Sequence, residues 1–107
     1  MNLFDHLPKN LRDTDVVAVE VVAPFKVRVT HRDGTRAVHV FDPEDFRGDY
    51  EAIGTPAVFA TAQAVDGRTL GWDLGGDLVY DLCRHSLWLH ARGFCDGSHD
   101  LSMEVER

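Results

Sequence analysis

The sequence predicts an α+β fold, in which an antiparallel sheet is built from two β-hairpins and is accompanied by a short middle helix and a C-terminal helix. Two Asp-Gly pairs, each between runs of apolar residues, indicate hairpin turns. An Asp-Pro pair in the middle of the chain, and leucines at helical spacing near its end, indicate the helices. With 107 residues, the chain has the length of one domain with one hydrophobic core.

The first hairpin is predicted after a polar segment, residues 1–14, which we expect to be a flexible arm. Apolar residues then alternate with other residues, and this period of two is typical of strands. The alternating residues are Val17, Val19, Val21, Phe25, Val27 and Val29. Asp33 and Gly34 indicate the turn, because glycine tolerates the positive φ that such turns require. Val38 and Val40 lie on the returning strand.

Each helix has a predicted start and a predicted end. In the middle of the chain, Asp42 is expected as the N-cap with Pro43 at the first helical position, and Gly48 and then Gly54 limit the helix to about two turns. The C-terminal helix is expected to have Asp77 as its N-cap and to stop at Gly93. The side chains expected on one face of that helix are Leu78, Leu82, His85 and Leu89.

The second hairpin is predicted around Asp66 and Gly67, between an alanine-rich strand and a strand that ends at Trp72. We take residues 15–93 as a single α+β domain and residues 94–107 as a C-terminal tail. Alternating apolar residues in the tail favour a short extra strand. They are Leu101, Met103 and Val105.

The charge and composition narrow the range of partners. The chain has 18 acidic and 11 basic residues and a formal net charge of −7. This balance repels a nucleic-acid backbone and attracts a basic protein. No apolar run is long enough to cross a bilayer, the first residues lack the pattern of a signal peptide, and two cysteines do not make a disulfide framework. We therefore expect a cytoplasmic protein that contacts neither nucleic acid nor a membrane.

The C-terminal third is rich in histidine and cysteine, which raises the question of a zinc site. The candidate ligands are Cys83, His85, His90, Cys95 and His99. On a helix, Cys83 and His85 point to different sides, and residues five apart, such as His85 and His90, do not face one another. Only Cys95 and His99 approach the spacing of paired zinc ligands. We expect no metal and no cofactor, and keep a zinc- or small-ligand-binding domain as the alternative.

No catalytic pattern stands out in the chain. The serines lack a Gly-x-Ser-x-Gly context, and the Gly75-Gly76 pair lacks the Lys and Ser/Thr of a phosphate-binding loop. The acidic run from Asp42 to Glu51 is explained by helix capping and a solvated face. The sequence therefore predicts a protein that is not an enzyme.

Short motifs between Val17 and about Leu82 carry a family resemblance through their order and spacing. They comprise Pro24, Val27, Val29, Asp33, Gly34, Ile53, Phe59, Thr69, Leu70, Trp72, Gly75, Asp77 and Leu78. In this pattern the chain resembles the bacterial domain of unknown function family 2442. The resemblance implies a small α+β domain with an antiparallel sheet, no known enzymatic activity and an accessory, regulatory or antitoxin-like role. The chain departs from the family pattern at His31, at Ala62 and Ala64, and in a longer tail.

Charge and resemblance together predict a protein-interaction module. The expected partner is another small protein, for which a basic charge is favourable, and the expected assembly is a homodimer. Exposed strand edges offer a route to both contacts. The expected contact residues are Trp72, Asp73 and Asp77, near the predicted turn from strand to helix. A purely structural subunit of a larger assembly is a further alternative.

Overall fold

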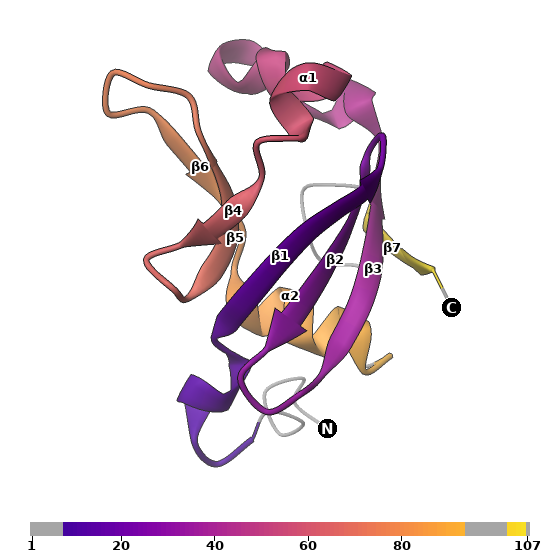
Figure 1. Cartoon of the computed structure of the whole chain (residues 1–107), viewed down its shortest axis with the longest axis vertical. Helices are drawn as coiled ribbons and strands as arrows, with labels where there is room; N and C mark the ends of the chain where they lie inside the picture. Colours follow the sequence, from indigo (N-terminus) through magenta and orange to yellow (C-terminus); the bar gives the residue numbers. More distant parts are fainter. Residues whose placement is uncertain (1–7, 94–102, 107) are drawn as a thin grey trace.

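Seven strands form two antiparallel sheets in the computed structural model, which describes residues 8–93 and 103–106 (Figure 1). Sheet A has the order β1-β2-β3-β7, and sheet B has the order β4-β5-β6. The strands are β1 (Val16–Ala23), β2 (Lys26–His31), β3 (Arg36–Phe41), β4 (Gln63–Val65), β5 (Thr69–Asp73), β6 (Val79–Asp81) and β7 (Met103–Glu106). The helices are α1 (Pro56–Phe59), α2 (Arg84–Ala91) and the 3₁₀-helices η2 (Leu11–Thr14), η3 (Pro43–Asp45) and η4 (Gly48–Gly54). The predicted α+β class and both hairpins are confirmed, with the two hairpins in separate sheets.

In sheet A, alternate residues of β2 and β3 point into the core. Val27 lies opposite His39 in the register, and both side chains are fully buried. The turn between β2 and β3 is the predicted one: Gly34 has a φ of 91°, and the backbone N–H of His31 donates to the carbonyl oxygen of Thr35 over 2.8 Å. Glycine adopts this left-handed conformation without steric conflict.

The turn between β5 and β6 corrects one prediction. Three consecutive residues there have positive φ: Gly75 (86°), Gly76 (57°) and Asp77 (66°). The backbone N–H of Leu74 donates to the carbonyl oxygen of Leu78 over 2.8 Å, so the strands stay paired up to this turn. The prediction that Asp77 caps the C-terminal helix is therefore wrong, because β6 follows the turn and α2 begins only at Arg84.

The middle of the chain begins a helix as predicted but does not continue it. The Asp42 side chain accepts a hydrogen bond from the backbone N–H of Glu44 over 2.9 Å, and Pro43 takes the first helical position. Phe46 then has extended dihedral angles (φ −84°, ψ 113°), which end η3 after three residues. This bend turns the Phe46 ring into the core, where it is 4% exposed. Two 3₁₀-helices, η3 and η4, therefore stand in place of the single two-turn helix, and the short α1 follows them.

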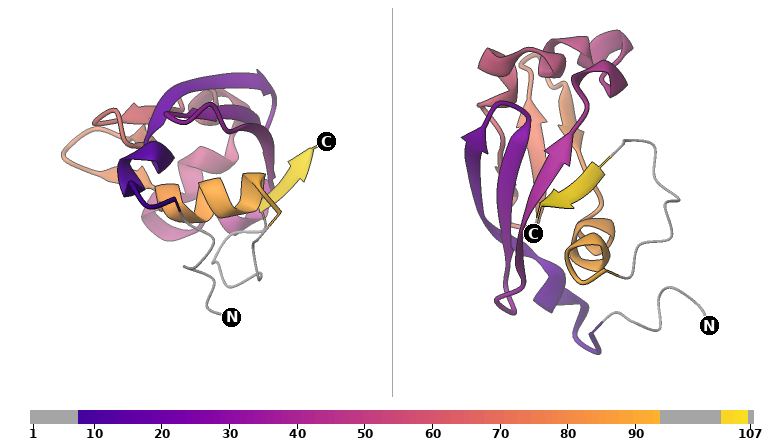
Figure 2. Two further views of the ribbon diagram at one scale, coloured as in Figure 1. Left: turned by 90° about the horizontal axis from the view of Figure 1, so that it is seen from below. Right: turned by 90° about the vertical axis from the view of Figure 1, so that its right-hand side faces the viewer.

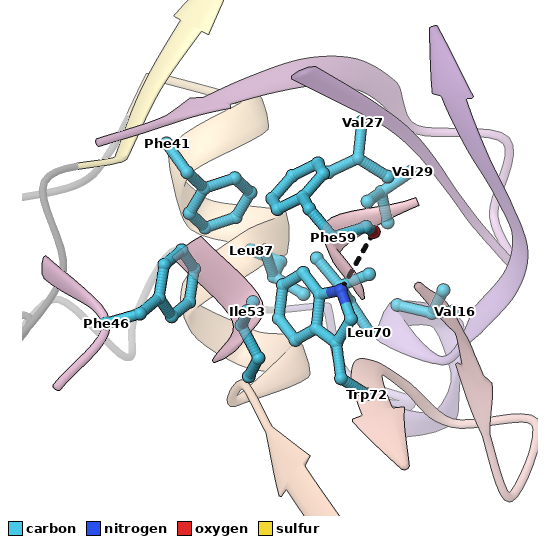
Figure 3. Close-up of a cluster of buried hydrophobic side chains, with 10 residues drawn as sticks. All are labelled: Val16, Val27, Val29, Phe41, Phe46, Ile53, Phe59, Leu70, Trp72 and Leu87. Carbon is cyan, nitrogen blue, oxygen red and sulfur yellow. Dashed lines mark hydrogen bonds between the residues drawn. The ribbon is translucent and has the colours of Figure 1, made fainter. Parts of the chain in front are cut away.

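The core lies between the two sheets and the helical segments (Figure 3). Its buried side chains are Val16, Val27, Val29, Phe41, Phe46, Ile53, Phe59, Leu70, Trp72 and Leu87. The indole N–H of Trp72 donates to the carbonyl oxygen of Phe59 over 3.0 Å. Phe41 meets Trp72 edge to face, with ring centroids 6.1 Å apart, an arrangement that adds to the stabilisation from apolar burial.

The two ends of the described chain pack against sheet A. Residues 11–14, part of the predicted arm, form η2, and Thr14 is fully buried. The Nδ1 atom of His31 hydrogen-bonds to the carbonyl oxygen of Thr14 over 2.6 Å, which fixes this segment against β2. At the other end, β7 pairs with β3 at the edge of sheet A (Figure 2). Residues 1–7 of the predicted arm and Leu101 of the predicted extra strand lie outside the described residues.

Candidate functional site

The three predicted contact residues separate in the structure. Trp72 points into the core and is 0% exposed, so its side chain cannot provide the partner contact that we expected. Side chains alternate along a strand, and β5 turns both Leu70 and Trp72 inward. Asp73 and Asp77 are exposed. Any contact made here by β5 must therefore use the side of sheet B opposite Trp72.

That outer side of sheet B carries carboxylates from neighbouring elements. In the register of β5 and β6, Asp73 lies opposite Val79 and Gly71 lies opposite Asp81. Asp66 lies in the turn between β4 and β5. The structure thus brings the predicted Asp73 together with two further carboxylates. We call the following set the acidic face: Gln63, Val65, Asp66, Asp73, Val79 and Asp81.

The acidic face surrounds a hollow of about 420 Å³. Its lining includes Asp66, Asp73 and Asp81 but neither lysine nor arginine. Val79 is 41% exposed and adds apolar surface beside these carboxylates. Carboxylates are ionised at neutral pH, so the hollow is negative and Asp77, in the adjacent turn, adds to that charge. Such a surface attracts cationic groups.

Gly71 lies on β5 between two members of the acidic face, opposite Gln63 of β4 and Asp81 of β6. A Cβ atom at this position would lie 2.6 Å from Cγ2 of Val65 and 2.8 Å from the carbonyl oxygen of Tyr80. These distances are too short for non-bonded atoms, so only glycine fits without a shift of its neighbours. A larger residue at this position would therefore displace Val65, which belongs to the acidic face.

Local backbone geometry holds the carboxylates of the acidic face in place. Asp66 has a φ of 55° and shares a tight turn with Gly67, whose φ is 64°. The Asp73 side chain accepts a hydrogen bond from the backbone N–H of Gly75 over 2.9 Å. Asparagine can replace aspartate in both roles, because it tolerates positive φ and keeps a side-chain oxygen that accepts hydrogen bonds.

The candidate metal ligands do not assemble within the described residues. His85 and His90 lie on α2, and Cys83 is an exposed free cysteine at its N-cap. The imidazole centroids of His39 and His90 are 6.2 Å apart. No group of three or more His, Cys, Asp or Glu side chains in residues 8–93 and 103–106 is placed to hold a metal ion. Cys95 and His99 lie outside the described residues.

Two histidines lie on the inner face of sheet A and are almost completely buried. Burial lowers the pKa of His39 to about 3, and repulsion from His90 and His31 acts in the same direction. Burial also lowers the pKa of His31, against the opposing effects of its hydrogen bond to Thr14 and of the Asp33 carboxylate. Neither ring nitrogen of His39 has a hydrogen-bond partner among the described residues. These rings are neutral at physiological pH and serve as packing groups between sheet A and α2.

The turn between β2 and β3 is tied to α2 through Asp33. The indole N–H of Trp88 donates to the Asp33 carboxylate over 2.9 Å, and the backbone N–H of Thr35 donates to the other carboxylate oxygen over 2.9 Å. Burial raises the pKa of Asp33, but these hydrogen bonds outweigh it and the net pKa is lowered. Asp33 is therefore a structural acid that fixes α2 against sheet A.

A second hollow, of about 890 Å³, lies between η3 and η4. Its lining mixes Glu44 and Glu51 with Arg47 around the edge of Phe46. None of the buried unpartnered polar atoms of the described chain belongs to its lining residues. Opposite charges in one lining compensate each other, so this hollow selects a charged ligand less strongly than the acidic face does.

Asp66, Val79 and Asp81 were not among the predicted contact residues. The sequence contains one signal for Val79 and Asp81: after Gly76, the order Val79-Tyr80-Asp81 alternates as a strand does, with Tyr80 pointing to the other side. A third strand of sheet B, once recognised there, places Val79 and Asp81 on the same side as Asp73.

Within the described part of the chain, no helix has the length and apolar character that crossing a bilayer requires. No protein-family model matches the chain, and no curated protein or solved structure is significantly similar to it. The resemblance to the domain of unknown function family 2442 therefore stays a prediction.

Proposed function

We propose that this protein is a non-enzymatic interaction module that holds a basic partner protein on the acidic face. The observation that carries the proposal is the grouping of Asp66, Asp73 and Asp81 around one hollow, beside exposed Val79 and without a cationic side chain in the lining. Lysine and arginine fit this surface, because their aliphatic stems pack on apolar groups while their charged ends pair with carboxylates. The net charge of −7 steers such a partner toward the protein.

The wider role that we propose is accessory, regulatory or antitoxin-like, in the cytoplasm, as the predicted family resemblance and the composition imply. A homodimer, which we also expect, has to form through another surface, because two acidic faces brought together repel each other. Native mass spectrometry of the untagged protein tests the dimer and detects a bound second polypeptide in the same measurement.

A neutralised variant tests the proposed contact. Asp66→Asn, Asp73→Asn and Asp81→Asn are combined, so that three charges are removed while the turn geometry is kept. Affinity capture from host extract compares this variant with the wild-type protein at low and high salt. A basic partner should be retained at least tenfold more strongly by the wild type, and salt should weaken the retention.

The matched control removes the same number of charges elsewhere on the chain. It combines Glu44→Gln, Asp49→Asn and Glu51→Gln, three exposed side chains of η3 and η4. Its retention of the partner should equal that of the wild type. Equal retention by the wild type and by the neutralised variant is the result that refutes the proposed function.

A further inference from the structure

β6 is an edge strand of sheet B, and part of its backbone points outward. The carbonyl oxygen of Leu78 accepts a hydrogen bond from the N–H of Leu74 over 2.8 Å, and the N–H of Leu82 donates to the carbonyl oxygen of Leu70 over 3.0 Å. Both groups therefore point toward β5. Backbone groups alternate in direction along an antiparallel strand, so the N–H and C=O groups of Val79 and Asp81 point away from β5. No described strand lies on that side of β6. In Figure 1, β6 lies at the end of sheet B, away from sheet A.

We infer that an extended basic segment of the partner adds to sheet B as a strand beside β6. This inference rests on the proposed function and specifies how the partner binds. In strand addition, main-chain hydrogen bonds supply affinity, and alternate side chains of the added strand supply specificity. Here the main-chain bonds would be made by Val79 and Asp81.

The two faces of β6 call for different side chains in the added strand. On the outer side, the neighbours of the added residues are Asp81 and Val79, which favour lysine or arginine. On the inner side, the neighbour is Tyr80, whose ring lies 4.5 Å from that of Tyr50 between centroids, and this favours an apolar residue. The partner segment that fits is therefore one in which basic and apolar residues alternate.

A second copy of this chain fits the same edge less well. Pairing of β6 with its own copy would bring the Asp81 and Asp73 carboxylates of both molecules onto one face, and like charges on neighbouring strands are destabilising. The charge of the acidic face therefore selects a segment of a basic protein over self-association at β6.

The test uses a short, fluorescently labelled peptide of alternating lysine and valine, with both ends capped. Its affinity for the full chain is measured by fluorescence anisotropy. Two further peptides carry backbone N-methyl groups, one on the lysines and one on the valines. They have the same charge, but the N–H groups of lysines and valines point to opposite edges of the peptide. Strand addition predicts that the two affinities differ by about tenfold, because only one edge bonds to β6.

A variant of β6 supplies the complementary evidence. Val79→Pro removes an N–H that points away from β5, so it leaves the bonds between β5 and β6 intact. Peptide affinity should be about fivefold or more lower in Val79→Pro than in Val79→Ala, which also loses the valine side chain but keeps the N–H group. Circular dichroism checks that both variants fold. Where Val79→Pro does not fold, the two methylated peptides decide the question on the wild-type chain.

The outcomes separate the two proposals. Equal affinities of the methylated peptides overturn strand addition. If the neutralised acidic face still weakens peptide binding in that case, the proposed function stands and only the binding mode is wrong. If neutralisation has no effect on peptide binding, the proposed function fails as well. A dimer in native mass spectra that Val79→Pro dissociates overturns the inference in favour of a second copy.

Discussion

Acid should destabilise this protein through His39. The ring is fully buried between sheet A and α2, without a hydrogen-bond partner for either nitrogen among the described residues. Its pKa is lowered from 6.5 to about 3, first by burial and then by His90 and His31. As the pH falls below about 6.5, the unfolded chain takes up a proton that the folded chain does not. Stability therefore falls with pH until the folded-state pKa is reached.

The size of this loss follows from the gap between the two pKa values. Each pKa unit corresponds to about 1.4 kcal/mol, so protonation of His39 alone lowers the free energy of unfolding by up to about 5 kcal/mol. At about pH 4.5, two units below the unfolded value, the loss from this residue is about 2.7 kcal/mol. A domain of this size has a total stability of about 5 to 15 kcal/mol, so the effect is large enough to measure.

Urea denaturation at about pH 8 and about pH 4.5 measures the loss, with His39→Leu as the test variant. Leucine fills a similar volume without a titrating group, so the variant should lose about 2.7 kcal/mol less than the wild type between these pH values. His85→Gln is the control. Burial lowers the pKa of His85 in the same direction as that of His39, but His85 is only partly buried. Equal losses in wild type and His39→Leu would refute the assignment of this pH dependence to His39.

Two further substitutions test the supports of the site and of the fold. Gly71→Ala places a Cβ atom 2.6 Å from Cγ2 of Val65, so we expect the free energy of unfolding to fall by about 1 to 3 kcal/mol and peptide binding to weaken. An unchanged midpoint of urea denaturation would contradict the close approach. Trp88→Phe removes the indole hydrogen bond to Asp33, and we expect a loss of about 1 kcal/mol and a higher pKa of that carboxyl, followed by NMR titration. An unchanged Asp33 pKa in Trp88→Phe would show that this bond does not form in solution.

The parts of the fold that depend on local backbone chemistry could be predicted from the sequence. The turn at Gly34 follows from the need for positive φ, and the turn at Asp66 and Gly67 follows in the same way. The Asp42 N-cap is also a local feature, since its side chain bonds to a backbone N–H two residues away. None of these features depends on contacts with distant parts of the chain.

The parts of the fold that were predicted wrongly depend on tertiary contacts. Leucines at helical spacing favoured a helix from Asp77, but the backbone of Leu78 instead bonds to Leu74 and that of Leu82 to Leu70 of β5. Only the pairing of the strands in sheet B decides between these two structures. Phe46 ends η3 because burial of its ring in the core requires an extended backbone at this residue. The sequence around Phe46 contains no helix breaker before Gly48, so it does not predict this end. Periodicity alone does not separate a short strand from a helix start in such a segment.

The acidic face depends on the same alternation that builds the core. Trp72 and Asp73 are consecutive, so they point to opposite sides of β5, one into the core and one into solvent. The indole bond to Phe59 and the aromatic contacts around Trp72 fix the backbone from which Asp73 projects. The hydrogen bond from the Gly75 N–H then fixes the Asp73 carboxylate itself. A surface that is already ordered before binding loses little conformational entropy when a partner arrives. In the proposed interaction, the buried side of β5 would therefore contribute to affinity on its exposed side, without any of its side chains touching the partner.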